Sequence, residues 1–295
     1  SMGENAAAAL AGVMSFEDCI GLVLLRGRLF DTIAPGGMLS VPMAEADLRP
    51  LISGDLDMAS VNAPGLCVVS GPDAALKALA ETLSAQGVDT QRIAIDIAAH
   101  SRMLEPILGR FGDYLRGIKL NAPQLPIISN RTGQPLTPAQ ATDPDYWVAH
   151  LRNTVMFQQT IGALLDEPRV FVEMGPGRAL SSLAQANGVA SGQVIPALRP
   201  PEQAMADDAW HIGPIARLWA CGVAVDWEPI WAGARRNRGA LPTYAFQKKP
   251  YFIQPGKAAE AETALPERVE NIANWGWKPH WRPASAGFDI AELAE

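Results

Sequence analysis

The sequence predicts an α/β fold in which a small ferredoxin-like subdomain is inserted into a larger subdomain of parallel strands and helices. Two stretches support this class. Ser1-Met2-Gly3-Glu4 is a turn of mostly small residues that enters an alanine-rich helix over residues 5–11. Residues 36–95 follow the order strand, helix, strand, strand, helix, strand, which is the split-βαβ pattern of a ferredoxin-like unit.

The N-terminal turn has two interpretations. In hydrolase-like α/β folds, a serine on a tight turn into a helix forms the second half of a nucleophile elbow, and the helix amides face the reacting oxygen. A Ser-Met pair before a glycine also arises from cloning, and four residues alone favour that origin. If Ser1 is the nucleophile, the strand that leads into the elbow is expected upstream of residue 1.

Composition excludes several function classes. The chain has 295 residues, of which 48% are apolar and 19% charged, so it can form a large core. Its net charge of −7 argues against a nucleic-acid partner. No apolar run is long enough to span a membrane. Cys19, Cys67 and Cys221 lie scattered in apolar segments, which predicts reduced core cysteines and a cytoplasmic protein.

Turn signals and periodicity divide the chain into four parts. Residues 1–35 and 96–198 are expected to form the large subdomain, and residues 36–95 the small one. The expected strands of the small subdomain cover residues 38–43, 58–62, 66–69 and 90–95, and its helices 44–52 and 73–86. In the large subdomain, helices are expected at 16–31, 101–118, 145–150, 158–165 and 178–186, and strands at 125–129, 169–173 and 193–198.

The C-terminal third has a different character. Residues 199–255 contain an expected helix at 210–221 and a strand at 223–227, then a run rich in Trp, Pro and Arg that resembles a linker laid over a surface. Residues 256–295 predict a flexible linker and the start of a following domain, with Trp275, Trp277 and Trp281 near its edge.

A serine nucleophile needs a base, and His100 is the candidate among four histidines. It follows a predicted strand, where α/β folds place catalytic groups. A lone histidine is more often structural. Asp96 could orient the imidazole, but along an extended strand it would lie about 13 Å away, too far for a hydrogen bond. Arg26 and Arg28 near a helix end have an ordinary explanation, because they complement the helix dipole.

Many short motifs together resemble the acyltransferase domains of type I modular polyketide synthases, relatives of malonyl-CoA:acyl-carrier-protein transacylases. Their order and spacing favour the nucleophile interpretation of Ser1 over the cloning one. The resemblance covers about residues 1–255 and rests on Ser1-Met2-Gly3-Glu4, residues 10–15, Arg26-Gly27-Arg28-Leu29, Asn62-Ala63-Pro64, residues 68–71, Ala99-His100-Ser101, residues 129–133, residues 173–177 and the linker-like residues 241–247.

The resemblance implies a role for each matching position. Ser1 corresponds to the acylated nucleophile and His100 to its base. The amide of Met2 corresponds to one oxyanion donor, and the second donor of the family would lie upstream. Arg26 corresponds to the arginine that binds the free carboxylate of a malonyl-type acyl group, which suits its planar fork of donors.

Pocket and orienting positions follow from the same resemblance. Asn62, Ala98 and Ala99 correspond to substrate-lining positions. His150 falls where the family orients its base through a backbone carbonyl, so its imidazole needs no role. Ile97-Ala98-Ala99-His100 matches neither selectivity pattern of the family, His-Ala-Phe-His for malonyl or Tyr-Ala-Ser-His for methylmalonyl, and we favour malonyl.

The implied function is transfer of an extender unit from CoA to Ser1 and then to the phosphopantetheine thiol of an acyl carrier protein. The implied partners are that carrier domain, an adjacent ketosynthase and further synthase domains. No metal or bound organic cofactor is implied. Two alternatives stay open: an α/β-type serine hydrolase or thioesterase, and a non-catalytic structural segment of a megasynthase.

Overall fold

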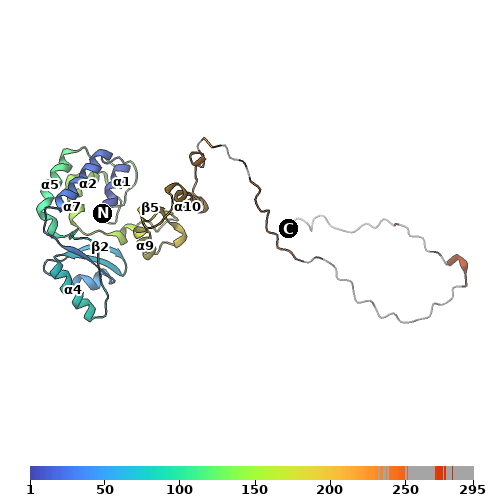
Figure 1. Cartoon of the computed structure of the whole chain (residues 1–295), viewed down its shortest axis with the longest axis horizontal. Coiled ribbons are helices and arrows are strands. Elements are labelled where there is room, and N and C mark those ends of the chain that lie inside the picture. Colours follow the sequence, from blue (N-terminus) through green and yellow to red (C-terminus); the bar gives the residue numbers. More distant parts are fainter. Residues whose placement is uncertain are drawn as a thin grey trace. The chain divides into compact units, whose positions relative to one another are not determined.

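The computed structural model describes residues 1–231, 233–234, 237, 239–249, 251, 270–274, 276 and 281. The chain divides into two compact units, Ser1–Ala232 and Gly233–Glu295. Each described helix longer than one turn and each described strand lies in the first unit (Figure 1).

Four helices form the first layer of this unit: α1 (Met2–Leu10), α2 (Phe16–Phe30), α5 (Glu105–Gly117) and α7 (Pro144–Arg152) (Figure 1). Ser15 begins α2 because its Oγ accepts the backbone N–H of Asp18 at 3.0 Å. A Cβ at Gly21 would collide with the hydroxyl of Tyr114, so this glycine allows α2 and α5 to pack closely. The shared core includes Ala8, Val13, Leu22, Leu29, Leu104, Ile107, Phe111, Leu115, Tyr146, Trp147 and Leu151.

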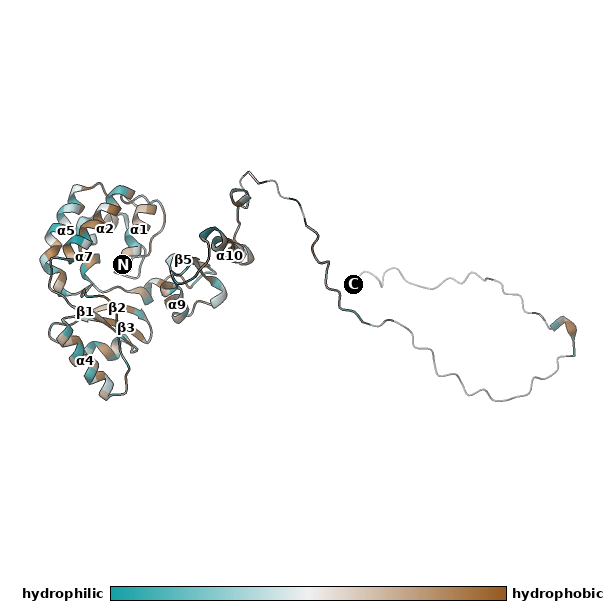
Figure 2. Ribbon diagram, viewed as in Figure 1, coloured by the Kyte–Doolittle hydropathy of each residue, from teal (hydrophilic) through white to brown (hydrophobic). Residues whose placement is uncertain are grey.

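The inserted unit is a four-stranded antiparallel sheet in the order β2-β3-β1-β4. Its strands are β1 (Gly37–Val41), β2 (Asp57–Ala63), β3 (Leu66–Gly71) and β4 (Gln91–Arg92). Helix α4 (Asp73–Ala85) and the single turn α3 (Glu45–Leu48) cover one face, and α4 alternates hydrophobic and hydrophilic residues as that position requires (Figure 2). The predicted α/β class with a second, ferredoxin-like subdomain is confirmed.

A second sheet pairs β5 (Phe171–Pro176) with β6 (Val194–Leu198) in parallel. Helix α9 (Ala179–Ala186) connects them, as a parallel pair requires. Helix α10 (Asp207–Ala220) packs on β6, where the indole of Trp210 donates to the carbonyl of Ala197 at 3.1 Å. The short helices α6 (Pro138–Ala141) and α8 (Phe157–Gly162) complete the unit.

Several elements differ from expectation because of proline. The strand expected at 125–129 contains Pro126, which has no N–H to donate, and only a bridge between Ile128 and Pro135 forms. The helix expected at 44–52 is cut to α3 and a 3-10 turn, Arg49–Leu51, that contains Pro50. The helix expected from residue 101 begins as a 3-10 turn, Arg102–Leu104, before α5.

Other corrections concern the C-terminal third and one cysteine. Residues 223–227 form no strand, since the N–H of Val223 instead closes the end of α10 on the carbonyl of Leu218. Cys221 is exposed, whereas Cys19 and Cys67 are buried as expected. Most of the linker predicted at 256–295, with Trp275 and Trp277, lies outside the described residues.

The second unit is described over residues 239–249 and a few short pieces. Its described side chains are exposed, and its one regular element in the described part is a 3-10 turn, Ile272–Asn274. The wrapping of residues 241–247 over the domain stays a prediction. No helix in the described part of the chain is long and apolar enough to cross a membrane.

Candidate active site

Ser1 and His100 meet at the start of α1. The Nε2 atom of His100 lies 2.9 Å from Ser1 Oγ, and Nδ1 lies 2.9 Å from the backbone carbonyl oxygen of Asn153. The carbonyl can only accept, so Nδ1 carries the proton and Nε2 is free to accept from the serine hydroxyl. This arrangement has the geometry of a nucleophile, its base and an orienting group.

The turn that presents His100 is strained. His100 is the one non-glycine residue in the described part of the chain with a positive φ, at 56°. The left-handed conformation costs an ordinary residue about 1–2 kcal/mol, so surrounding contacts must hold it. Buried Ser101 supplies one of them, since its hydroxyl donates to the carbonyl of Ala98 at 2.7 Å.

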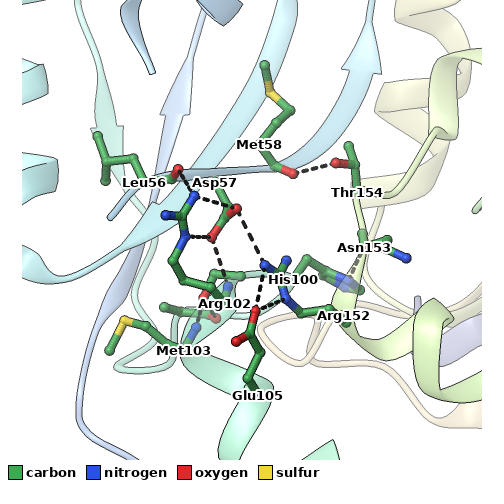
Figure 3. A network of polar contacts seen from close by, with 12 residues as sticks. Leu56, Asp57, Met58, His100, Arg102, Met103, Glu105, Arg152, Asn153 and Thr154 are labelled. Atoms are coloured by element: carbon green, nitrogen blue, oxygen red, sulfur yellow. Dashed lines mark hydrogen bonds and ion pairs between the residues drawn. The ribbon is translucent and has the colours of Figure 1, made fainter. Parts of the chain in front are cut away.

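The orienting carbonyl belongs to Asn153 and not to His150, which corrects the expectation (Figure 3). Helix α7 ends at Arg152, and Asn153 is its C-cap. Carbonyls in the body of a helix are used by the helix itself, and those at its end are free for other donors. The assignment to His150 came from the family resemblance and was three residues too early.

Burial holds the pKa of His100 far below its usual value, at about 3. Three positive neighbours lower it further: the Ser1 amino group, His150 and Arg26. The hydrogen bond to Asn153 acts in the opposite direction. Where a residue precedes Ser1, its amino group is an uncharged amide and that contribution disappears, but the effect of burial remains. The imidazole is thus neutral near pH 7, as a base must be.

Met2 is the first residue of α1, with Ser1 as its N-cap. A first-turn N–H has no acceptor inside its helix, and the positive end of the helix dipole adds to it. The amide of Met2 therefore starts beside the nucleophile with a free donor, which is the position expected of an oxyanion donor.

Arg26 lies in α2, and its charge is near enough to the site to lower the pKa of both His100 and the Ser1 amino group. Burial lowers the pKa of its own guanidinium. The guanidinium stacks over the ring of Phe30 at 5.1 Å, and no carboxylate pairs with it among the described residues. A desolvated cation without a partner is a ready binding site for an anion.

The expected pocket residues come from two segments, the His100 turn and strand β2. Ala98 and Ala99 are buried in the His100 turn, and Ala99 packs on Met38, Ala59 and Val68 of the small sheet. Asn62 is half-buried on β2, and its backbone carbonyl accepts from the side chain of Asn187, the C-cap of α9. Substrate contact by these three residues stays a prediction.

A buried polar network behind Ser1 was missed by sequence reasoning. The carboxylate of Glu4 accepts the backbone N–H of Asn130 and the hydroxyl of Tyr146, each at 2.8 Å. Its Oε2 also lies 3.4 Å from Nε2 of His150, at the long end for a hydrogen bond. The imidazole of His150 therefore faces a carboxylate, although this contact does not have the geometry of a hydrogen bond. The sequence did contain a signal for this network, because an acidic residue, Glu4, stands in the Ser1-Met2-Gly3-Glu4 turn.

The fold and the hydrogen-bonded serine and histidine are those of α/β enzymes with a serine nucleophile. The chain belongs to the acyl transferase domain family, because the model of the family described as "Acyl transferase domain" matches residues 1–211. It is an acyltransferase domain of the type found in type I polyketide synthases.

Relatives agree with this assignment. The chain is 38% identical over 269 residues to polyketide synthase GfsB of Streptomyces halstedii, covering 90% of this chain and 5% of that protein. It is 34% identical over 274 residues to the spectinabilin polyketide synthase system protein NorB of Streptomyces orinoci, covering 90% of this chain and 12% of that protein. The chain thus spans a small part of these relatives.

Two crystal structures of acyltransferase domains are similar to it. The domain of SpnD, in complex with 2-(pent-4-yn-1-yl)malonyl, is 37% identical with a TM-score of 0.71, over 75% of this chain and 54% of that one. The domain from the second module of the salinomycin polyketide synthase is 35% identical with a TM-score of 0.74, over 82% of this chain and 57% of that one.

Proposed function

We propose that this domain transfers a malonyl-type acyl group from CoA to Ser1 and then to the phosphopantetheine thiol of an acyl carrier protein. The observation that supports it most is the 2.9 Å contact between Ser1 Oγ and His100 Nε2, with Nδ1 held by Asn153. A neutral imidazole in this position can accept the serine proton as the hydroxyl attacks a thioester.

The reaction has two matched halves. Ser1 Oγ attacks the thioester carbonyl carbon while its proton passes to His100 Nε2. The C–S bond then breaks, and the imidazolium returns the proton to the leaving CoA sulfur. In the second half His100 takes the proton of the carrier thiol, the sulfur attacks the acyl-serine ester, and the C–O bond breaks as Ser1 regains its proton.

Two backbone groups stabilise the charges that develop. The Asn153 carbonyl lies on the Nδ1 side of His100 and favours the imidazolium in both halves. The amide of Met2 donates to the oxyanion of each tetrahedral intermediate, in the role expected of the residue after an elbow serine. A second oxyanion donor is expected from residues upstream of Ser1.

The unpaired guanidinium of Arg26 supports a dicarboxylic acyl group over a plain acyl chain. Bidentate pairing would hold the free carboxylate while the thioester faces Ser1. The SpnD domain, similar to this chain, was solved with a substituted malonyl group. Among extender units we favour malonyl, because the position-97 tyrosine of the methylmalonyl pattern is absent here.

Intact-protein mass spectrometry tests the proposal. The full-length protein and its Ser1→Ala variant are mixed with malonyl-CoA, and the acyl adduct is located by peptide mapping. A stable adduct on Ser1 that is absent from the variant is expected. Rapid release of free malonate without an adduct would instead indicate a hydrolase. No reaction at all, with both proteins folded, would indicate a structural segment.

Arg26→Ala tests the substrate class. We expect malonyl loading to fall by about 100-fold or more, since a buried carboxylate loses its partner, while acetyl loading changes little. Equal losses for the two donors would assign Arg26 a structural role. Arg28→Ala, on the exposed side of the same helix end, is the matched control.

A further inference from the structure

The His100 turn is fastened to the small sheet by one carboxylate, that of Asp57 at the start of β2 (Figure 3). Asp57 Oδ2 accepts the backbone N–H of Arg102 at 2.8 Å and its Nε–H at 3.0 Å. Oδ1 accepts from Nη2 of the same arginine at 3.3 Å. The backbone bond matters most, because it fixes the main chain two residues after the strained His100.

The same carboxylate reaches the segment that orients the base. Arg152 Nη2 lies 3.7 Å from Asp57 Oδ1, and Arg152 directly precedes Asn153. Beyond Asn153, the Thr154 hydroxyl donates to the carbonyl of Met58 at 2.7 Å (Figure 3). The N–H of Val155 donates to the carbonyl of Ala59 at 2.9 Å. Both sides of the orienting carbonyl are therefore tied to β2.

We propose that Asp57 is a positioning residue for acyl transfer. Its carboxylate fixes the position of the His100 turn relative to the segment around Asn153. The inference rests on the proposed function, in which His100 is the base. Asp57 itself makes no hydrogen bond to Ser1 or His100 in the described structure, so it acts through the main chain and side chain of Arg102 and through the side chain of Arg152. Its place in the small sheet means that this sheet sets the geometry of a dyad built on the large subdomain.

A positioning role makes a specific kinetic prediction. The imidazole has to keep both of its 2.9 Å contacts during the reaction, and a misplacement of about 1 Å can cost about 100-fold in rate. Asp57→Ala should lower kcat for malonyl loading by about 10- to 100-fold with KM for malonyl-CoA nearly unchanged. Asp57→Asn keeps one oxygen for the Arg102 N–H, so most of the rate should return.

The experiment compares Asp57→Ala, Asp57→Asn and Glu105→Gln in the full-length protein. Glu105 is the matched control, since its carboxylate binds Arg152 at 3.2 Å and makes no hydrogen bond to Arg102 in the described structure, while its backbone N–H, which donates to the Arg102 carbonyl, is kept in Gln. Loading is measured by the rate of adduct formation on Ser1, and folding by thermal unfolding. The wild-type protein is measured first. If it forms no adduct on Ser1, the proposed function itself fails, and this result is distinct from a failure of the role proposed for Asp57.

A Ser1→Cys background separates positioning from general damage. A thiol with a pKa of about 8.5 ionises by itself at high pH and needs little help from a base. The loss caused by Asp57→Ala should therefore shrink severalfold at pH above about 9 in this background. Three outcomes would overturn the proposal. The first is a rate loss of equal size in the wild-type and Ser1→Cys backgrounds, and the second is an unchanged rate in Asp57→Ala. The third is a rate loss in Asp57→Asn that is explained by a lower unfolding temperature of that variant.

Discussion

A carboxylate lies three residues after the nucleophile and another supports the turn of the base, but in different surroundings. Glu4 lies behind Ser1 with 4% of its side chain exposed, as does its neighbour His150. Asp57 supports the His100 turn with 17% of its side chain exposed, and its partner Arg102 with 46%. One carboxylate belongs to the helical core, and the other bridges the helices to the small sheet.

This difference indicates how each half of the site tolerates change. A buried carboxylate is costly to strand or remove, because its donors lose their partner in a dry environment. When a partly exposed carboxylate is removed, water can reach the donors that it leaves, so the cost in stability is smaller. We therefore expect defects on the nucleophile side to appear as unfolding, and defects on the base side to appear as slow chemistry in a folded protein.

Glu4→Ala should have the largest effect on stability. It leaves the Asn130 N–H without its acceptor and the Tyr146 hydroxyl with only Ser129 Oγ, and a stranded buried donor costs about 1–3 kcal/mol. Urea unfolding followed by fluorescence measures the loss. Glu17→Ala, an exposed acid in the first turn of α2, is the control and should change stability by less than about 1 kcal/mol. Similar losses in the two variants would contradict the comparison.

His100→Ala should separate activity from stability. General-base help is worth about 10²- to 10⁴-fold, and loading should fall by that factor. The unfolding midpoint near pH 7 should fall less than in Glu4→Ala, since alanine loses the two hydrogen bonds of the imidazole, each worth about 0.5–1.5 kcal/mol, and strands no buried backbone N–H. A loss below about tenfold would assign the proton to another base. A large drop in stability would place His100 with Glu4 as a structural group.

Sequence reasoning predicted the features that depend on neighbouring residues and missed contacts between distant segments. The serine turn, the helix at 16–30 and the strand order of the small sheet follow from caps, turns and periodicity within a few residues. Ser1 and His100 are 99 positions apart, and their meeting followed from the family resemblance. Asn153 was missed because the resemblance placed the orienting carbonyl three residues earlier, at His150, and Asp57 was missed because its partners come from two other segments.

The pH dependence of stability gives a finer test of the base side. Burial lowers the pKa of His100 from 6.5 to about 3, so the unfolded chain binds a proton below pH 6.5 that the folded chain refuses. Stability therefore falls as pH drops through this window, by up to about 1.4 kcal/mol per pH unit from this group. Above pH 6.5 the group contributes no slope. Between pH 6.5 and 5, His100→Ala should show a visibly shallower slope than the wild type in urea titrations, and parallel slopes would refute the low pKa.

Ionic strength should produce the smallest effect and separate the two carboxylates directly. Salt screens charges that water can reach, and the Debye length shrinks from about 30 Å at 0.01 M to about 3 Å at 1 M. Arg102 and Arg152 hold Asp57 where solvent enters, whereas Glu4 is enclosed by Tyr146 and Asn130. The difference in unfolding temperature between wild type and Asp57→Asn should thus shrink by roughly half or more over this range of salt. The difference for Glu4→Gln should stay constant, because no ions reach that site. If salt weakened both differences equally, Glu4 would be as accessible as Asp57, and the distinction between a nucleophile held by burial and a base held by a bridging carboxylate would be wrong.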